Sequence, residues 1–196
     1  MKNNKYLSLK PFTSYLILTG FLLCAGMKCK KDATGIDALP PATQEGKNTF
    51  GCLVNGVAFT PKGSNLGGPR LNCFYQYLNS STSQGYYFNI TCLRNESNSN
   101  RGIAINGDSL IIKEGNTYQL KNYSQKNQAY GSYSIVSGAG NINNYMTSGN
   151  FIGELYISKL DEVNLIVSGT FWFDAVNDKG EKVEVREGRF DVHYVK

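Results

Sequence analysis

The sequence has a single histidine and a single tryptophan, and its five cysteines show no paired spacing. Structural zinc sites need close pairs of cysteine or histidine ligands, so this composition argues against a zinc protein. The histidine, His193, lies two residues from Asp191, but no serine or cysteine can be assigned to complete a catalytic triad with them. We therefore expect no catalytic residue, no metal site and no bound cofactor.

Helical periodicity is also missing beyond the first 28 residues, and the chain has no internal repeat. Short alternating segments are instead separated by polar turns, and 21 residues are glycine. Many short strands with regular turns are typical of an all-β protein, either an antiparallel β-sandwich or an open β-barrel. We expect one such domain over residues 49–196.

The clearest strand pattern lies in the C-terminal 32 residues, where apolar residues alternate from Leu165 to Ala175. A turn at residues 178–180 places Gly180 in the left-handed conformation of a bulged hairpin and sets Phe173 opposite Val185. The apolar positions then change phase, which predicts a β-bulge at Gly188. The residues expected on the outer face are Ile166, Ser168, Thr170, Trp172 and Asp174.

A second hairpin is predicted from residues 70–78 and 85–94. If Asn79 faces Tyr86, Cys73 lies opposite Cys92. Directly opposed antiparallel residues have Cα separations of roughly 4.5–5.5 Å, which suits a disulfide. An exported protein permits this bond, and two small buried residues are the alternative interpretation.

The first 28 residues have the features of a lipoprotein signal peptide. Three lysines and no acidic residue precede an apolar run at residues 12–27, which is short for a membrane span. We expect a lipid-modified cysteine after this run, at Cys29 or alternatively at Cys24. Such an anchor makes the membrane a partner and predicts a location in the bacterial cell envelope, at the outer membrane.

Residues 29–48 contain few apolar side chains and two adjacent prolines, which predicts a flexible linker. The chain has 20 basic and 15 acidic residues, and removal of residues 1–28 takes away four lysines and leaves 16 against 15. This near balance gives no support for a nucleic-acid partner.

The opening stretch LPPATQEG at 39–46 followed by TFGCLVNG at 49–56, and the closing stretches GTF at 169–171 and EGRFDV at 187–192, resemble an uncharacterised lipoprotein family of Bacteroidota. The sequence CKKD at 29–32 is similar to the usual lipidated start of that family. The family has no known function, so the resemblance implies an envelope location and an all-β architecture without an activity.

Aromatic residues are abundant, with 13 tyrosines and 10 phenylalanines, and most aromatics on sheets build cores. An exposed row that includes Trp172 and Tyr156 would stack against sugar rings or contact a protein partner. These two residues are the candidate ligand-stacking site.

Acidic residues offer two further arrangements. Carboxylate pairs of the kind that glycosidases use could be drawn from Glu154, Asp174, Glu184 and Asp191. Calcium-loop spacing is not met near Asn177, where Asp174 and Asp178 predict a turn instead. The sequence therefore favours a non-enzymatic binding or interaction module with a glycan or protein ligand, and an envelope hydrolase acting on glycans is the alternative.

Overall fold

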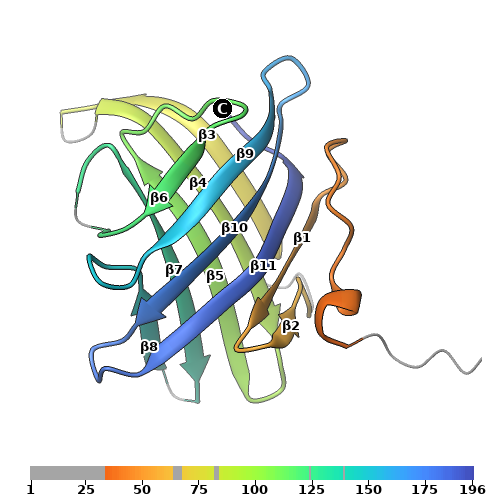
Figure 1. Ribbon diagram of the computed structural model, residues 1–196, viewed down its shortest axis with the longest axis vertical. Coiled ribbons are helices and arrows are strands. Elements are labelled where there is room, and N and C mark those ends of the chain that lie inside the picture. The colour runs from red at the N-terminus through yellow and green to blue at the C-terminus, as the bar shows by residue number, and fades with distance from the viewer. Residues whose placement is uncertain (1–33, 64–67, 82–83, 124, 139) are drawn as a thin grey trace, which may run out of the picture. The chain divides into compact units, whose positions relative to one another are not determined.

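β-Strands make up most of the structure, a computed structural model that describes residues 34–63, 68–81, 84–123, 125–138 and 140–196 (Figure 1). A short 3-10 helix, η1 (Gly35–Ala38), precedes the strands. The strands are β1 (Thr49–Val54), β2 (Val57–Phe59), β3 (Leu71–Asn79), β4 (Gln84–Asn95), β5 (Ser99–Asp108), β6 (Thr117–Leu120), β7 (Gln128–Ser137), β8 (Asn141–Met146), β9 (Gly153–Asp161), β10 (Ile166–Val176) and β11 (Lys182–His193). The predicted all-β class is confirmed.

The strands form one sheet in the order β2-β1-β11-β10-β9-β6-β7-β5-β4-β3, and β8 pairs with β7 and β10. Neighbours are antiparallel except β6 and β7, which run parallel. The sheet curls so that its two ends come together. Among the described residues, two isolated bridges join them, Phe74 of β3 with Val195 after β11 and Lys62 after β2 with Arg94 of β4. The fold is therefore an open β-barrel, and only these two isolated bridges link its two ends in the described part of the chain.

The interior of the barrel is filled by apolar side chains from alternate positions of the strands. The largest fully buried side chains are Phe50, Phe88, Phe173, Ile90, Ile103, Ile105, Ile112, Leu120, Leu155, Ile157, Val167 and Val185. They belong to one continuous core, so burial on the inner face fixes which residues of each strand point outward.

The β10–β11 hairpin has the predicted register, with Phe173 opposite Val185 and Gly180 at φ 80°. The bulge is present, but the left-handed residue is Glu187 at φ 55°, one position before the predicted Gly188. Gly188 instead pairs with Phe171, and a Cβ atom there would lie 2.5 Å from the Phe171 ring. Gly188 therefore makes room for an aromatic ring rather than for a turn of the backbone.

The β3–β4 hairpin departs from its predicted register by two residues. Asn79 pairs with Gln84, so Cys73 lies opposite Ile90 and Cys92 lies opposite Leu71. Both cysteines are buried free thiols, and burial raises the pKa of each above its usual value. The predicted Cys73–Cys92 disulfide is therefore wrong, and the alternative of two buried residues holds.

The prediction of a flexible linker is wrong for residues 34–48, which we call the N-terminal segment. Leu39 is buried, and a Cβ atom on Gly51 of β1 would lie 2.6 Å from Pro40. Lys159 of β9 donates a hydrogen bond of 3.1 Å to the Gln44 carbonyl. Figure 1 shows this segment beside β1, so the folded unit includes residues well before the expected start at Thr49.

The predicted signal peptide and both candidate lipidation sites, Cys29 and Cys24, lie outside the described residues. Within the described part of the chain, no helix has the length and apolar character needed to cross a membrane.

Candidate functional site

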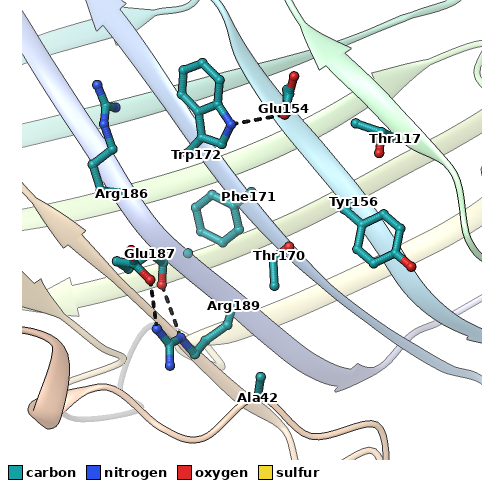
Figure 2. A pocket seen from close by; sticks show the side chains of 11 residues that line it. Ala42, Thr117, Glu154, Tyr156, Thr170, Phe171, Trp172, Arg186, Glu187 and Arg189 are labelled. Atoms are coloured by element: carbon teal, nitrogen blue, oxygen red, sulfur yellow. Dashed lines mark hydrogen bonds and ion pairs between the residues drawn. The ribbon is translucent and has the colours of Figure 1, made fainter.

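The two predicted stacking residues, Trp172 and Tyr156, line one surface groove of about 560 Å³ (Figure 2). The groove lies on the outer face of β9, β10 and β11. Its polar rim contains Thr117, Glu154, Thr170, Arg186, Glu187 and Arg189. The groove falls within the roughly 300–1,000 Å³ range of small-molecule sites.

Strand register explains why Trp172 and Tyr156 share this face. Tyr156 pairs with Thr170 and Glu154 pairs with Trp172, so the two aromatic residues are diagonal neighbours across β9 and β10. Their chain neighbours Leu155 and Phe171 are buried in the core, which turns Trp172 and Tyr156 outward. Tyr156 remains 41% exposed, so its ring is accessible to a ligand.

Trp172 is held in place by two charged residues. The Arg186 guanidinium lies 5.4 Å from the centre of the indole ring, a cation–π arrangement, and the indole Nε1 donates a hydrogen bond of 3.3 Å to Glu154 (Figure 2). Arg186 is itself fixed by Asp174, whose Oδ1 lies 2.5 Å from Nη2, and by a 3.1 Å hydrogen bond to the Phe173 carbonyl. The indole is therefore oriented before any ligand arrives.

The β-bulge supplies the opposite rim of the groove. Glu187 is the left-handed residue of the bulge, and its carboxylate lies 3.4 Å from Arg189. Ala42 from the N-terminal segment lies near Arg189 in Figure 2 and also lines the groove. Sequence reasoning missed Glu187, Arg189 and Ala42, although the change of phase near Gly188 was a signal that this part of β11 is irregular.

Beyond this groove, the N-terminal segment covers the outer face and encloses the Asp191 carboxylate. The carboxylate accepts hydrogen bonds from Thr43 Oγ1 at 2.6 Å, from Ser168 Oγ at 2.8 Å, and from three backbone N–H groups at 2.7–3.1 Å. Those N–H groups belong to Glu45, Gly46 and Lys47. Five donors thus converge on one buried side chain.

This enclosure changes the acidity of Asp191 and argues against a role for it as a general acid. Burial alone raises the pKa of the carboxyl, but the hydrogen bonds from Thr43, Glu45, Ser168 and Gly46 outweigh it and hold the pKa well below its usual range. An enclosed, ionised carboxylate cannot serve as a proton donor to a substrate. Ser168, which was predicted on the outer face, is buried because its hydroxyl donates a hydrogen bond to the enclosed Asp191.

The remaining sequence candidates do not converge with Asp191. Asp174 is paired with Arg186, whereas Glu154 lines the groove and Glu184 is exposed. His193 is exposed, and its backbone N–H donates to Asn48 Oδ1 at 3.0 Å.

The turn near Asp178 is organised by an amide rather than by a metal ligand set. Asn177 Oδ1 accepts hydrogen bonds from the backbone of Lys179 at 3.0 Å and Glu181 at 2.9 Å, as the turn interpretation requires. Among the described residues, no three His, Cys, Asp or Glu side chains gather closely enough to hold a metal ion.

Comparison with known proteins places most of the barrel in one family. The family model described as a domain of unknown function (DUF6252) matches residues 82–192, more than half of the chain. The match includes the closing stretches that resemble a lipoprotein family, and it begins after the opening stretch. No curated protein and no solved structure matches the chain.

Proposed function

The chain belongs to the DUF6252 family, whose description assigns no activity, and we propose that it is a lipid-anchored binding module of the cell envelope whose groove binds a glycan. One observation carries this proposal. Trp172 and Tyr156 lie diagonally on one open sheet face, inside a groove whose rim is charged and polar. Aromatic rings that combine an apolar face with a polar edge are typical of recognition surfaces.

A sugar fits this combination better than a purely apolar ligand does. The C–H face of a pyranose ring packs on an aromatic ring, and its hydroxyl groups need hydrogen-bond partners at the edge of the contact. Glu154, Glu187 and Arg189 provide acceptors and donors at the rim of the groove. Because the indole is already oriented by Arg186, little conformational entropy is lost on binding.

Binding is favoured over hydrolysis by the state of the carboxylates. A glycosidase needs two carboxyl groups that face each other across the scissile bond. Asp191 is enclosed by the N-terminal segment and Asp174 is paired with Arg186. Asp174 lies opposite Glu184 on β11, but the Arg186 guanidinium lies close to both carboxylates, which favours an ion-paired surface over a hydrolytic pair.

The anchor is proposed from the N-terminal sequence, with its lysine-rich start, its apolar run and Cys29 before Lys30. Mass spectrometry of the mature N-terminus tests it, and we expect a lipid-modified cysteine at residue 29, or at residue 24. An unmodified N-terminus downstream of Cys29 would contradict the anchor without affecting the groove.

The groove is tested through its own fluorescence, because Trp172 is the only tryptophan of the chain. The full chain is titrated with cellohexaose, maltohexaose and chitohexaose, three oligosaccharides of different linkage or composition. We expect at least one to change the tryptophan emission saturably. Calorimetry gives the affinity independently, and chromatography of the sugar shows whether it stays intact.

Variants assign the binding to the groove. Trp172→Ala should abolish binding measured by calorimetry, and Trp172→Phe should restore part of it because the stacking ring remains. Tyr77→Ala is the matched control, since Tyr77 is 52% exposed and does not line the groove. Equal binding by wild type and Trp172→Ala would overturn the glycan site, and shortened sugar products would favour the hydrolase alternative.

A further inference from the structure

A second cavity of about 300 Å³ lies at one end of the barrel and shares no lining residue with the groove. It is lined by the β1–β2 hairpin, by residues flanking the β4–β5 turn, and by side chains of β7, β8 and β11. Strands distant in sequence therefore converge on it. The mouths of β-barrels are a common location for small-molecule sites, and the volume is at the lower end of their range.

Positive charge dominates the lining of this cavity. Arg94, Arg101 and Lys182 line it together with a single carboxylate, Glu96. Glu96 Oε1 lies 2.8 Å from Arg94 Nε, and Oε2 lies 3.4 Å from Arg101 Nη2. Two guanidinium groups thus share one carboxylate, which fixes both side chains and leaves an excess of positive charge.

Arg101 also keeps a donor that Glu96 does not satisfy. Its Nε is buried and has no hydrogen-bond partner in the part of the chain that the structure describes. A buried donor without an acceptor is unfavourable, and an acceptor group on a bound ligand removes that penalty. A guanidinium is planar and pairs with a carboxylate through two parallel hydrogen bonds, so an incoming carboxylate is the group that fits it best.

The wall of the cavity is aromatic. The Tyr133 ring packs edge-on against Phe59 at 6.3 Å between ring centres and lies 5.8 Å from the Tyr145 ring. The Tyr145 hydroxyl donates a hydrogen bond of 3.2 Å to Glu181, so this aromatic cluster is held rigidly. An aromatic wall beside a cationic rim suits a ligand with an apolar face and one negative group.

We propose that this cavity is a binding site for a small organic carboxylate, such as an acidic sugar. The carboxylate pairs with Arg101 and Arg94, and the body of the ligand packs against Tyr133 and Tyr145. This site is separate from the groove at Trp172, and the proposal does not depend on whether the groove binds a glycan.

The experiment compares three probes on the full chain. Glucuronate carries a ring and a carboxylate, glucose carries the ring alone, and inorganic phosphate carries charge without a ring. Calorimetry should give saturable binding of glucuronate and at least tenfold weaker binding of the other two. Nuclear magnetic resonance should place the glucuronate-induced shifts at Tyr133 and Tyr145 rather than at Trp172.

Variants assign the charge that is responsible. Arg101→Gln should weaken glucuronate binding at least tenfold, and Arg101→Lys should recover only part of it because lysine lacks the planar fork. Lys126→Gln removes one positive charge from an exposed loop outside the cavity and should change the affinity by less than twofold.

Several results would overturn the proposal. They are the absence of saturable glucuronate binding, equal affinity for phosphate, and equal losses in Arg101→Gln and Lys126→Gln. Shifts centred on Trp172 would also overturn it, by moving the ligand to the groove. The wild-type spectra decide the matter even if Arg101→Gln fails to fold, because they locate the ligand without a variant.

Discussion

Two halves of the outer face of β10 differ in what covers them. Near its N-terminal end, Ile166 and Ser168 are buried beneath the N-terminal segment, and Ser168 contacts the enclosed Asp191. Two to four residues further along the same face, Thr170 is exposed and Trp172 lines the groove. The strand alternates in the same way in both halves, so the difference comes from a segment that lies more than 100 residues away in the sequence.

This difference separates a stabilising region from a recognition region. In the covered half, five donors make hydrogen bonds to one buried, ionised carboxylate, and the loss of that carboxylate leaves buried donors without partners. In the open half, Trp172 contacts Glu154 and Arg186 at the surface, where interactions contribute little to stability. Substitutions in the covered half should therefore lower the stability of the protein. Substitutions in the open half should change ligand binding and have little effect on stability.

The largest effect is expected for Asp191→Ala. The substitution leaves buried donors from Thr43, Ser168 and the backbone of residues 45–47 without an acceptor, which should lower the free energy of unfolding by roughly 3–5 kcal/mol. Urea unfolding measures the change. Glu184→Ala removes an exposed carboxylate of the same strand and should cost less than about 0.5 kcal/mol. Equal costs would mean that the hydrogen bonds to Asp191 do not anchor the N-terminal segment.

Acid should weaken the covered half next. The pKa of Asp191 is lower in the folded protein than in the unfolded chain, so its contribution is fully present above about pH 4, the unfolded value. That contribution should be lost progressively as the pH falls from about 4 toward the folded pKa. Urea unfolding of wild type and Asp191→Ala, measured at several pH values from about 7 to about 3, checks this expectation. The gap between the two proteins should narrow at low pH, and a constant gap would contradict the role of the charge.

A smaller effect is expected for Ser168→Val. Valine removes the hydroxyl that donates to Asp191 and adds bulk beneath the N-terminal segment, so we expect a loss of roughly 1–3 kcal/mol. Thr170→Val is the matched control because Thr170 occupies the next position on the same face and is exposed. Thermal unfolding of both variants compares them, and similar melting temperatures would remove the distinction between the two halves.

The smallest effect on stability is expected for Trp172→Ala. The variant loses a surface cation–π contact and one hydrogen bond of 3.3 Å, which together should cost about 0.5–1 kcal/mol. Its melting temperature should fall by only roughly 1–4 °C. A loss as large as that of Asp191→Ala would show that the open half is part of the stabilising structure rather than a recognition surface.

Local sequence signals predicted the β10–β11 hairpin because its register depends on residues close together in the chain. The turn that ends at Gly180 has one favourable conformation, and it sets the pairing of Phe173 with Val185. The change in phase along β11 also required a bulge. The position of the bulge could not be read, since both Glu187 and Gly188 precede the change and either can shift the phase by one residue.

The predictions failed where no local signal exists. The loop of residues 80–83 has no residue that fixes its length, and the two-residue slip in β3–β4 keeps the same side chains inside the barrel. The burial of Cys73 was therefore predictable, but its pairing partner was not. β8 was missed because Asn141–Met146 is mostly polar, and its pairing with β7 is what makes it a strand.

The covered half escaped prediction for a related reason. A buried serine on an apparently polar face can be recognised only when its distant partner is known, and the segment around Thr43 reads as a linker by composition. The open half was easier to identify, because Trp172 and Tyr156 are large aromatic residues at outward positions of adjacent strands. Their diagonal arrangement follows from a register that the sequence does not determine.

β11 and the residues just after it join parts of the barrel that lie far apart in the sequence. β11 pairs with both β10 and β1, and Val195 just beyond it joins the far edge of the sheet at Phe74. Pairing across more than 100 residues requires the closure of long loops, which slows folding. β1 therefore cannot complete its pairing in the sheet until β11, more than 100 residues later in the sequence, is available. Closure of the barrel through β11 is therefore expected to be the slow step of folding.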